Sequence, residues 1–188
     1  MQRQWYGDRR DLLKWTVVAE LAERGVAKRM LYVSFLREGE QEPPVHPIVW
    51  EHFRGIDNLE ELANNLDLDF EMIEASFDPR SRSEYIACVM EWFQRSDTRR
   101  CVVLLDPDTG VAPKKVSSKH VTKNELCTIW DELKSGDWLL IYQHRWRDRQ
   151  WREKAETGLL ELLPGAHVKS EYRDGIVTDA AILVARKK

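Results

Sequence analysis

The stretch Arg99-Arg100-Cys101-Val102-Val103-Leu104-Leu105-Asp106-Pro107-Asp108-Thr109-Gly110 decides the fold of this chain. Five consecutive apolar residues end abruptly at Asp-Pro-Asp-Thr-Gly. A short apolar run with β-branched residues, ended by Pro and Gly, predicts a strand buried on both faces. Such strands belong mainly to helix-covered parallel sheets, in which ligands bind outside the carboxyl ends of the strands. Asp106 and Asp108 are therefore predicted at a ligand-binding edge.

Apolar periodicity outside this stretch predicts helices that alternate with strands. The predicted helices span 8–24, 58–65, 83–95, 122–136 and 147–163. The predicted strands span 29–36, 48–53, part of 69–77, 101–105, 138–142, 168–172 and 177–185. Thr122 and Glu125 have the spacing of a capping box. The last two strands are joined by a turn, which predicts a three-layer Rossmann-like α/β sheet, mostly parallel with an antiparallel C-terminal hairpin.

Length and composition predict one domain over residues 1–188. No apolar run approaches the roughly 20 residues of a membrane-spanning helix, so no membrane association is expected. The first ten residues lack the apolar core of a signal peptide, which predicts a cytoplasmic protein. The three cysteines lie far apart among apolar neighbours. We expect buried thiols there, with no disulfide and no metal site.

Basic residues gather in two segments, although the net charge is −3. Segments 114–123 and 145–152 hold four lysines and four arginines, respectively, against a single aspartate. Both segments follow predicted strand ends, on the edge that carries Asp106. Basic side chains bind phosphates and exposed tryptophans stack on bases, so RNA or DNA is a predicted partner; the alternative is a solvated helix start with inward tryptophans. The predicted contacts are Lys114, Lys115, Lys119, His144, Arg145, Trp146, Arg147 and Arg149.

Three segments resemble the Rossmann-like S-adenosylmethionine-dependent methyltransferases. The strand end 103–108 resembles the Asp-Pro-Pro-Tyr strand end of the amino-methyltransferase branch. Segment 6–15 is similar to the Gly-Asn-x-x-Asp-Val-x-Lys-His opening of the 23S ribosomal RNA adenine-N6 methyltransferases. The strand 138–142 and the hairpin after it match the final part of that fold. Together these matches span most of the chain.

The resemblance implies methyl transfer from S-adenosylmethionine to an amine of a nucleic acid. By analogy with the family's strand-end motif, it implies an acceptor site at Asp106, Pro107 and Asp108. The implied cofactor contacts are Gly7, Asp11, Lys14 and Ser34. A strand-end oxygen would hold the amine and orient its lone pair.

Departures from the family pattern leave other functions open. Asp108 and Thr109 replace the second proline and the aromatic residue of the motif, and Trp15 replaces the histidine. The first strand ends at 33–35 with Val-Ser-Phe, where the family has an acidic residue and a glycine loop, which predicts bulk at the cofactor position. One alternative is a non-catalytic relative that binds nucleic acid or a protein partner. Another is a Mg²⁺-dependent phosphate-processing enzyme using Asp106 and Asp108, and a third reading makes them only turn residues.

Overall fold

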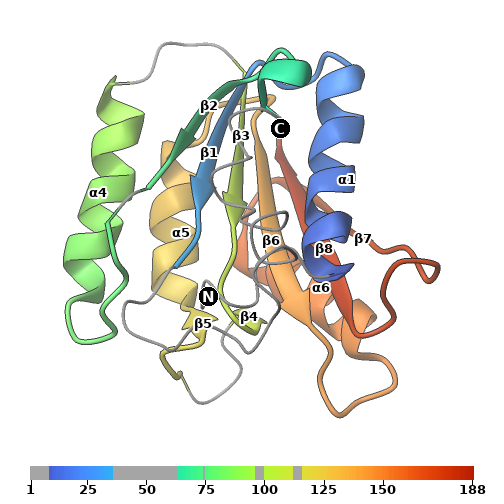
Figure 1. Cartoon of the computed structure of the whole chain (residues 1–188). Coiled ribbons are helices and arrows are strands. Elements are labelled where there is room, and N and C mark those ends of the chain that lie inside the picture. Colours follow the sequence, from blue (N-terminus) through green and yellow to red (C-terminus); the bar gives the residue numbers. More distant parts are fainter. Residues whose placement is uncertain (1–8, 36–62, 74, 96–99, 112–115) are drawn as a thin grey trace, which may run out of the picture.

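A six-stranded sheet forms the centre of the computed structural model (Figure 1), which describes residues 9–35, 63–73, 75–95, 100–111 and 116–188. The strand order is β2-β1-β3-β6-β8-β7. These strands are β1 (Arg29–Val33), β2 (Asp69–Met72), β3 (Cys101–Leu105), β6 (Trp138–His144), β7 (Ala166–Glu171) and β8 (Ala180–Lys187). Two short strands, β4 (Gly110–Val111) and β5 (His120–Val121), form a separate parallel pair.

The first four strands of that order run parallel to one another, whereas β8 is antiparallel to both β6 and β7. The predicted fold class, a mostly parallel sheet with an antiparallel C-terminal hairpin, is confirmed. Leu104 of β3 lies opposite Tyr32 of β1 and Leu140 of β6. The carboxyl ends of the parallel strands point to the bottom of Figure 1, where β4 and β5 also lie.

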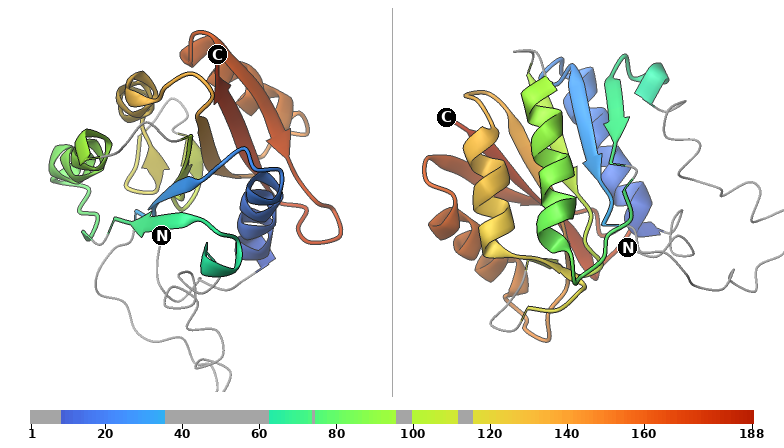
Figure 2. Two further views of the ribbon diagram at one scale, coloured as in Figure 1. Left: turned by 90° about the horizontal axis from the view of Figure 1, so that it is seen from above. Right: turned by 90° about the vertical axis from the view of Figure 1, so that its left-hand side faces the viewer.

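Helices cover both faces of the sheet, as Figure 2 shows: α1 lies on one face, and α4, α5 and α6 lie on the other. Their bounds are α1 (Arg9–Glu23), α4 (Arg82–Arg95), α5 (Lys123–Glu132) and α6 (Trp151–Leu162). Side chains of a strand alternate between the faces. Val103 and Leu105 belong to the core shared with α4, α5 and α6, whereas Val102 and Leu104 belong to the core shared with α1. Asp106 continues the second series and faces α1.

The predicted capping box at the start of α5 is confirmed. The Thr122 hydroxyl accepts a hydrogen bond from the Glu125 backbone at 3.2 Å, and the Glu125 carboxylate accepts one from the Thr122 backbone at 2.7 Å. Arg82 at the start of α4 donates two further bonds to this carboxylate, at 2.7 and 2.6 Å. The bidentate pair ties the starts of α4 and α5 together beside the carboxyl edge.

Several predicted boundaries differ from the structure. Helix α6 begins at Trp151 and not at residue 147, because the Asp148 carboxylate accepts a bond from the Gln150 backbone at 2.8 Å and forms a turn. The predicted strand 48–53 and most of the predicted helix 58–65 lie outside the described residues. All three cysteines are free, but only Cys101 is fully buried. None of the helices in the described ranges has the length and apolar character needed to cross a membrane.

Candidate functional site

A buried ionic cluster lies at the carboxyl end of β3. The Lys14 ammonium donates to Asp106 Oδ2 at 2.6 Å and also pairs with the Asp11 carboxylate. The Tyr32 hydroxyl donates to the same Asp106 oxygen at 2.7 Å. Asp11, Lys14 and Asp106 are 3 %, 3 % and 2 % exposed. Fully buried charges are rare and costly in proteins, so this is the strongest candidate for a functional site in the described chain.

The local structure explains how these residues meet. Asp11 and Lys14 are three residues apart on α1 and therefore lie on the same helical face. Tyr32 and Asp106 extend from adjacent parallel strands toward that face. The Tyr142 ring, on β6, lies 5.3 Å from the Lys14 nitrogen, close enough for a cation–π contact.

Lys14 is held in its charged form. Burial alone would lower the pKa of Lys14, but the carboxylates of Asp106 and Asp11 outweigh burial and raise it above the usual 10.5. The cluster then contains two carboxylates and one ammonium group. The Asp106 carboxylate lies at the strand end, where it can accept a hydrogen bond from a ligand.

The loop after Asp106 is fixed by Gln143, a fully buried residue of β6. Its amide oxygen accepts a bond from the Val111 backbone at 3.0 Å, and its amide nitrogen donates to the Thr109 carbonyl at 3.0 Å. Gly110 passes so close that an added Cβ would lie 2.4 Å from the Gln143 oxygen. Gln143 therefore sets the path of the chain that leaves the ionic cluster.

We expect Gly110→Ala to lower the free energy of unfolding by about 1–3 kcal/mol, measured by urea denaturation. Gly110 has a φ of +102°, which strains any residue with a Cβ, and the added methyl group would clash with Gln143. Gly175→Ala is the matched control, because the space around Gly175 is open. Equal losses in the two variants would contradict this account of the loop.

The structure separates the two carboxylates of the Asp-Pro-Asp motif. Asp106 binds Lys14 and Tyr32, whereas Asp108 is half-exposed and acts electrostatically on His120. The described ranges contain no group of three His, Cys, Asp or Glu side chains able to hold a metal. The two carboxylates therefore have different partners among the described residues. Pro107 is buried directly after Asp106.

The phenyl ring at the end of β1 packs into the core on one face of the sheet. Phe35 adopts a left-handed backbone, with a φ of 49°, and its ring packs against Phe77 and Tyr85 in the core shared with α4 and α5. The ring thus lies on the opposite face from Asp106. Ser34 is buried, and its hydroxyl lies near that of Tyr85 without a well-aligned hydrogen bond. Gly7 lies outside the described residues.

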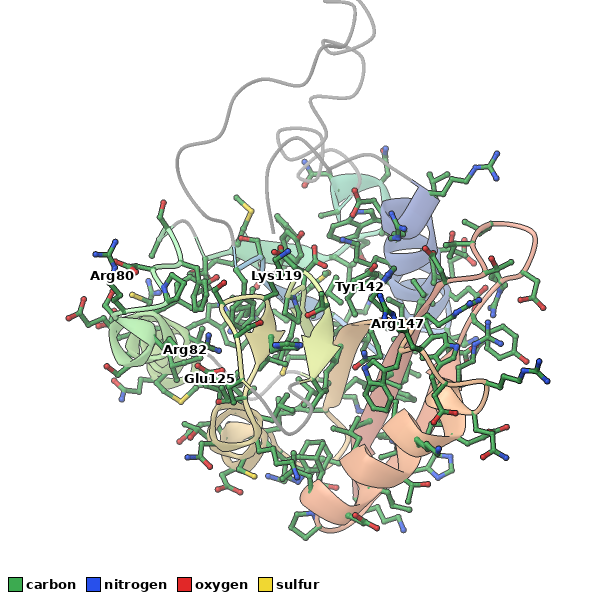
Figure 3. The ribbon with its side chains drawn as sticks, turned by 90° about the horizontal axis from the view of Figure 1, so that it is seen from below. Arg80, Arg82, Lys119, Glu125, Tyr142 and Arg147 are labelled. Carbon is green, nitrogen blue, oxygen red and sulfur yellow. The ribbon has the colours of Figure 1, made fainter. Side chains whose placement is uncertain are left out.

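Predicted basic contacts gather on the carboxyl edge, which Figure 3 views end-on with Lys119 and Arg147 labelled. Exposed side chains there are Lys119, Arg145, Arg147 and Arg149. Trp146 differs from the prediction of an exposed stacking ring, since it is half-buried and packs against the core. Lys114 and Lys115 lie outside the described residues.

An ion pair not predicted from sequence borders the cluster. Arg10 of α1 donates to the Asp179 carboxylate at 2.6 Å, just before β8. His144 ends β6 beside this pair: burial lowers its pKa, Asp179 opposes that shift, and Arg10 and Arg145 add to it. Tyr32 and Tyr142 were also missed. A buried tyrosine in a strand signals a nearby partner, but only the strand register identifies it.

Comparisons with known proteins support the fold. No protein-family model and no curated protein matches the sequence. A DUF574 family protein from Streptomyces avermitilis superposes over 96 % of this chain and 83 % of its own, with 14 % identity and a TM-score of 0.53. A provisionally named methyltransferase from Thermobifida fusca superposes over 96 % of this chain and 80 % of its own, with 13 % identity and a TM-score of 0.52.

This chain has a methyltransferase-like fold. At such low identity the likeness extends to the fold alone. Neither structure is described as a ribosomal RNA adenine methyltransferase, so that closer resemblance rests on the sequence motifs.

Proposed function

We propose that this protein is an S-adenosylmethionine-dependent methyltransferase that acts on an amine of a nucleic acid. The observation that carries the proposal is the ionic cluster of Asp106, Lys14 and Asp11 on a methyltransferase-like sheet. It lies outside the carboxyl end of a central strand, where ligands bind in open α/β sheets.

The Asp106 carboxylate has the geometry of a hydrogen-bond acceptor for the substrate amine. Lys14 and Tyr32 both bind Oδ2, and no described residue donates to Oδ1. Oδ1 is therefore the oxygen that would accept a hydrogen bond from the amine and orient its lone pair. Lys14 and Tyr32 hold the carboxylate in one orientation, which reduces the entropic cost of aligning the reacting nitrogen.

The described residues fit S-adenosylmethionine in one respect. The Ser34 hydroxyl at the end of β1 is buried without a well-aligned partner, so it can bond a ligand. Lys14 already serves two carboxylates, so we assign it to holding Asp106 and not to the cofactor. When bound, S-adenosylmethionine would supply an electrophilic methyl group.

One observation favours a non-catalytic relative as the second candidate. Asp106 is only 2 % exposed, and a substrate amine must reach it. Under this alternative the cluster is purely structural, and the basic edge binds nucleic acid without chemistry.

Methyl transfer separates the two candidates. Purified protein, methyl-labelled S-adenosylmethionine and either total RNA or denatured DNA are incubated, and label in the nucleic acid is counted. The proposal expects label in one of the two pools, with release of an N-methylated nucleoside on digestion. Absence of label from both pools, with nucleic-acid binding intact, would favour the non-catalytic candidate.

Binding of single-stranded RNA of about 30 nucleotides tests whether the exposed basic side chains at the carboxyl edge of the sheet contact nucleic acid. We expect the affinity for RNA to fall as the salt concentration rises. Changing Arg145, Arg147 and Arg149 together to Ala should reduce the slope of log affinity against log salt concentration by about two. The matched control changes Lys28, Lys134 and Lys188 to Ala, because all three lie at the opposite edge of the sheet. Similar slopes for the two triple variants would rule out the carboxyl edge as the contact surface.

A further inference from the structure

A cavity lies on the other face of the sheet from Asp106. It has a volume of about 540 Å³ and lies between α5, α6 and the carboxyl end of β6. Ligand pockets fall in the range of roughly 300–1,000 Å³. The proposed methyl transfer assigns this cavity no role, although Trp146, which lines it, is among the nucleic-acid contacts predicted from sequence.

The cavity has an apolar floor and an aromatic side. Ala155 and Leu159 of α6 form part of the floor, and Trp146 lines the cavity while packing against the core. Gly158 also lines it, from the middle of α6. Glycine inside a helix costs about 0.5–1 kcal/mol relative to alanine. No left-handed backbone or close neighbour requires glycine here, so its effect is to leave the floor of the cavity open.

One cation of the lining can pair with an anionic group of a ligand. Lys123 begins α5, and its ammonium group makes no ion pair with a described residue. Lys154 also lines the cavity and pairs with Asp148 outside the lining, and Glu161 is the single carboxylate in the lining. Lys123 is therefore the cation of the lining with which a negatively charged group of a ligand can pair.

We infer that this cavity binds a nucleotide, with its base against Trp146 over Gly158 and its phosphate beside Lys123. A planar ring suits the open floor and the indole, and a phosphate suits the lysine. A free nucleotide and one nucleotide of a nucleic-acid strand share this chemistry. The inference is independent of the proposed methyl transfer, because Asp106 faces α1 across the sheet.

The cavity lies next to the loop that follows Asp106. Gln143 lines the cavity and also binds the backbone of Val111 and Thr109. A nucleotide in the cavity would therefore lie next to the buried residue that sets the path of the loop.

Calorimetric titration of the full chain with adenosine 5′-monophosphate tests the inference. Gly158→Leu fills the open floor and is expected to weaken binding about tenfold or more, whereas Gly158→Ala should stay within about twofold of wild type. Both substitutions favour the helix, so loss of folding does not explain the difference. Lys123→Gln should weaken binding of the nucleotide about three- to fivefold and leave binding of adenosine unchanged. Lys188→Gln is the control.

The same variants are titrated with a single-stranded adenine oligonucleotide. If the natural ligand is one nucleotide of a strand, Gly158→Leu should weaken binding of the oligonucleotide. If the natural ligand is a free nucleotide, Gly158→Leu should weaken binding of the mononucleotide only. Three results would overturn the inference: no binding of either probe at about 5 mM, equal affinity in Gly158→Leu and Gly158→Ala, or displacement of the mononucleotide by S-adenosylmethionine.

Discussion

Replacing Lys14 with methionine is expected to lower the free energy of unfolding at pH 7 by about 3–5 kcal/mol. Asp11 and Asp106 would then remain buried and close together without their shared cation. Urea denaturation measures the loss. Lys28→Met is the matched control, because Lys28 is exposed in its pair with Asp67 and should change stability by less than about 1 kcal/mol.

The pH dependence of stability identifies Lys14 as the origin of that loss. The folded-state pKa of Lys14 lies above its ordinary value of 10.5. Its contribution is therefore complete below pH 10.5 and is lost as the pH rises through the folded-state pKa. Wild-type protein should lose stability in that alkaline range relative to the Lys14→Met variant. A loss at pH 7 below about 1 kcal/mol, or parallel alkaline curves, would show that the cluster is not ionised as described.

Asp106→Asn is expected to reduce methyl transfer about 100-fold or more, because the amide is a poorer acceptor for the substrate amine than the carboxylate. The variant should remain folded, since Lys14 keeps its pair with Asp11. Label incorporated into nucleic acid measures the rate at saturating substrate.

Asp108→Asn is the control for Asp106→Asn, because Asp108 lies apart from the cluster on the His120 side. We expect it to retain activity within about threefold of wild type, an order-of-magnitude margin. Loss of activity in Asp108→Asn with full activity in Asp106→Asn would indicate that Asp108, and not Asp106, accepts the hydrogen bond from the substrate amine. Equal losses of activity in the two variants would indicate that the two carboxylates share one function.

Local patterns predicted most of the fold. The apolar run before Asp106 identified β3, and the Thr122–Glu125 spacing identified the start of α5. These features depend on residues near one another in the chain, where helix capping and strand burial act directly. The direction of Asp106 toward α1 follows from strand alternation, which is also local.

The contacts of the site depend on residues far apart in the sequence. Lys14 and Asp106 are separated by 92 positions, and Arg10 and Asp179 by 169. Sequence similarity suggested Lys14 as a cofactor contact, but its two carboxylate partners appear only when α1 packs on β3. Phe35 shows the same limit, since its left-handed backbone turns the ring into the opposite core. Tertiary packing, and not local propensity, decides these positions.

Calorimetric titration of the wild-type chain with S-adenosylmethionine tests the central claim most directly. The proposal predicts one binding site per chain with a dissociation constant between about 1 μM and 1 mM, weakened in Ser34→Ala and retained in Asp108→Asn. S-adenosylhomocysteine should compete for the same site. Absence of binding heat, together with an unchanged melting temperature at about 5 mM ligand, would contradict the assignment of a methyl-donor site to this sheet.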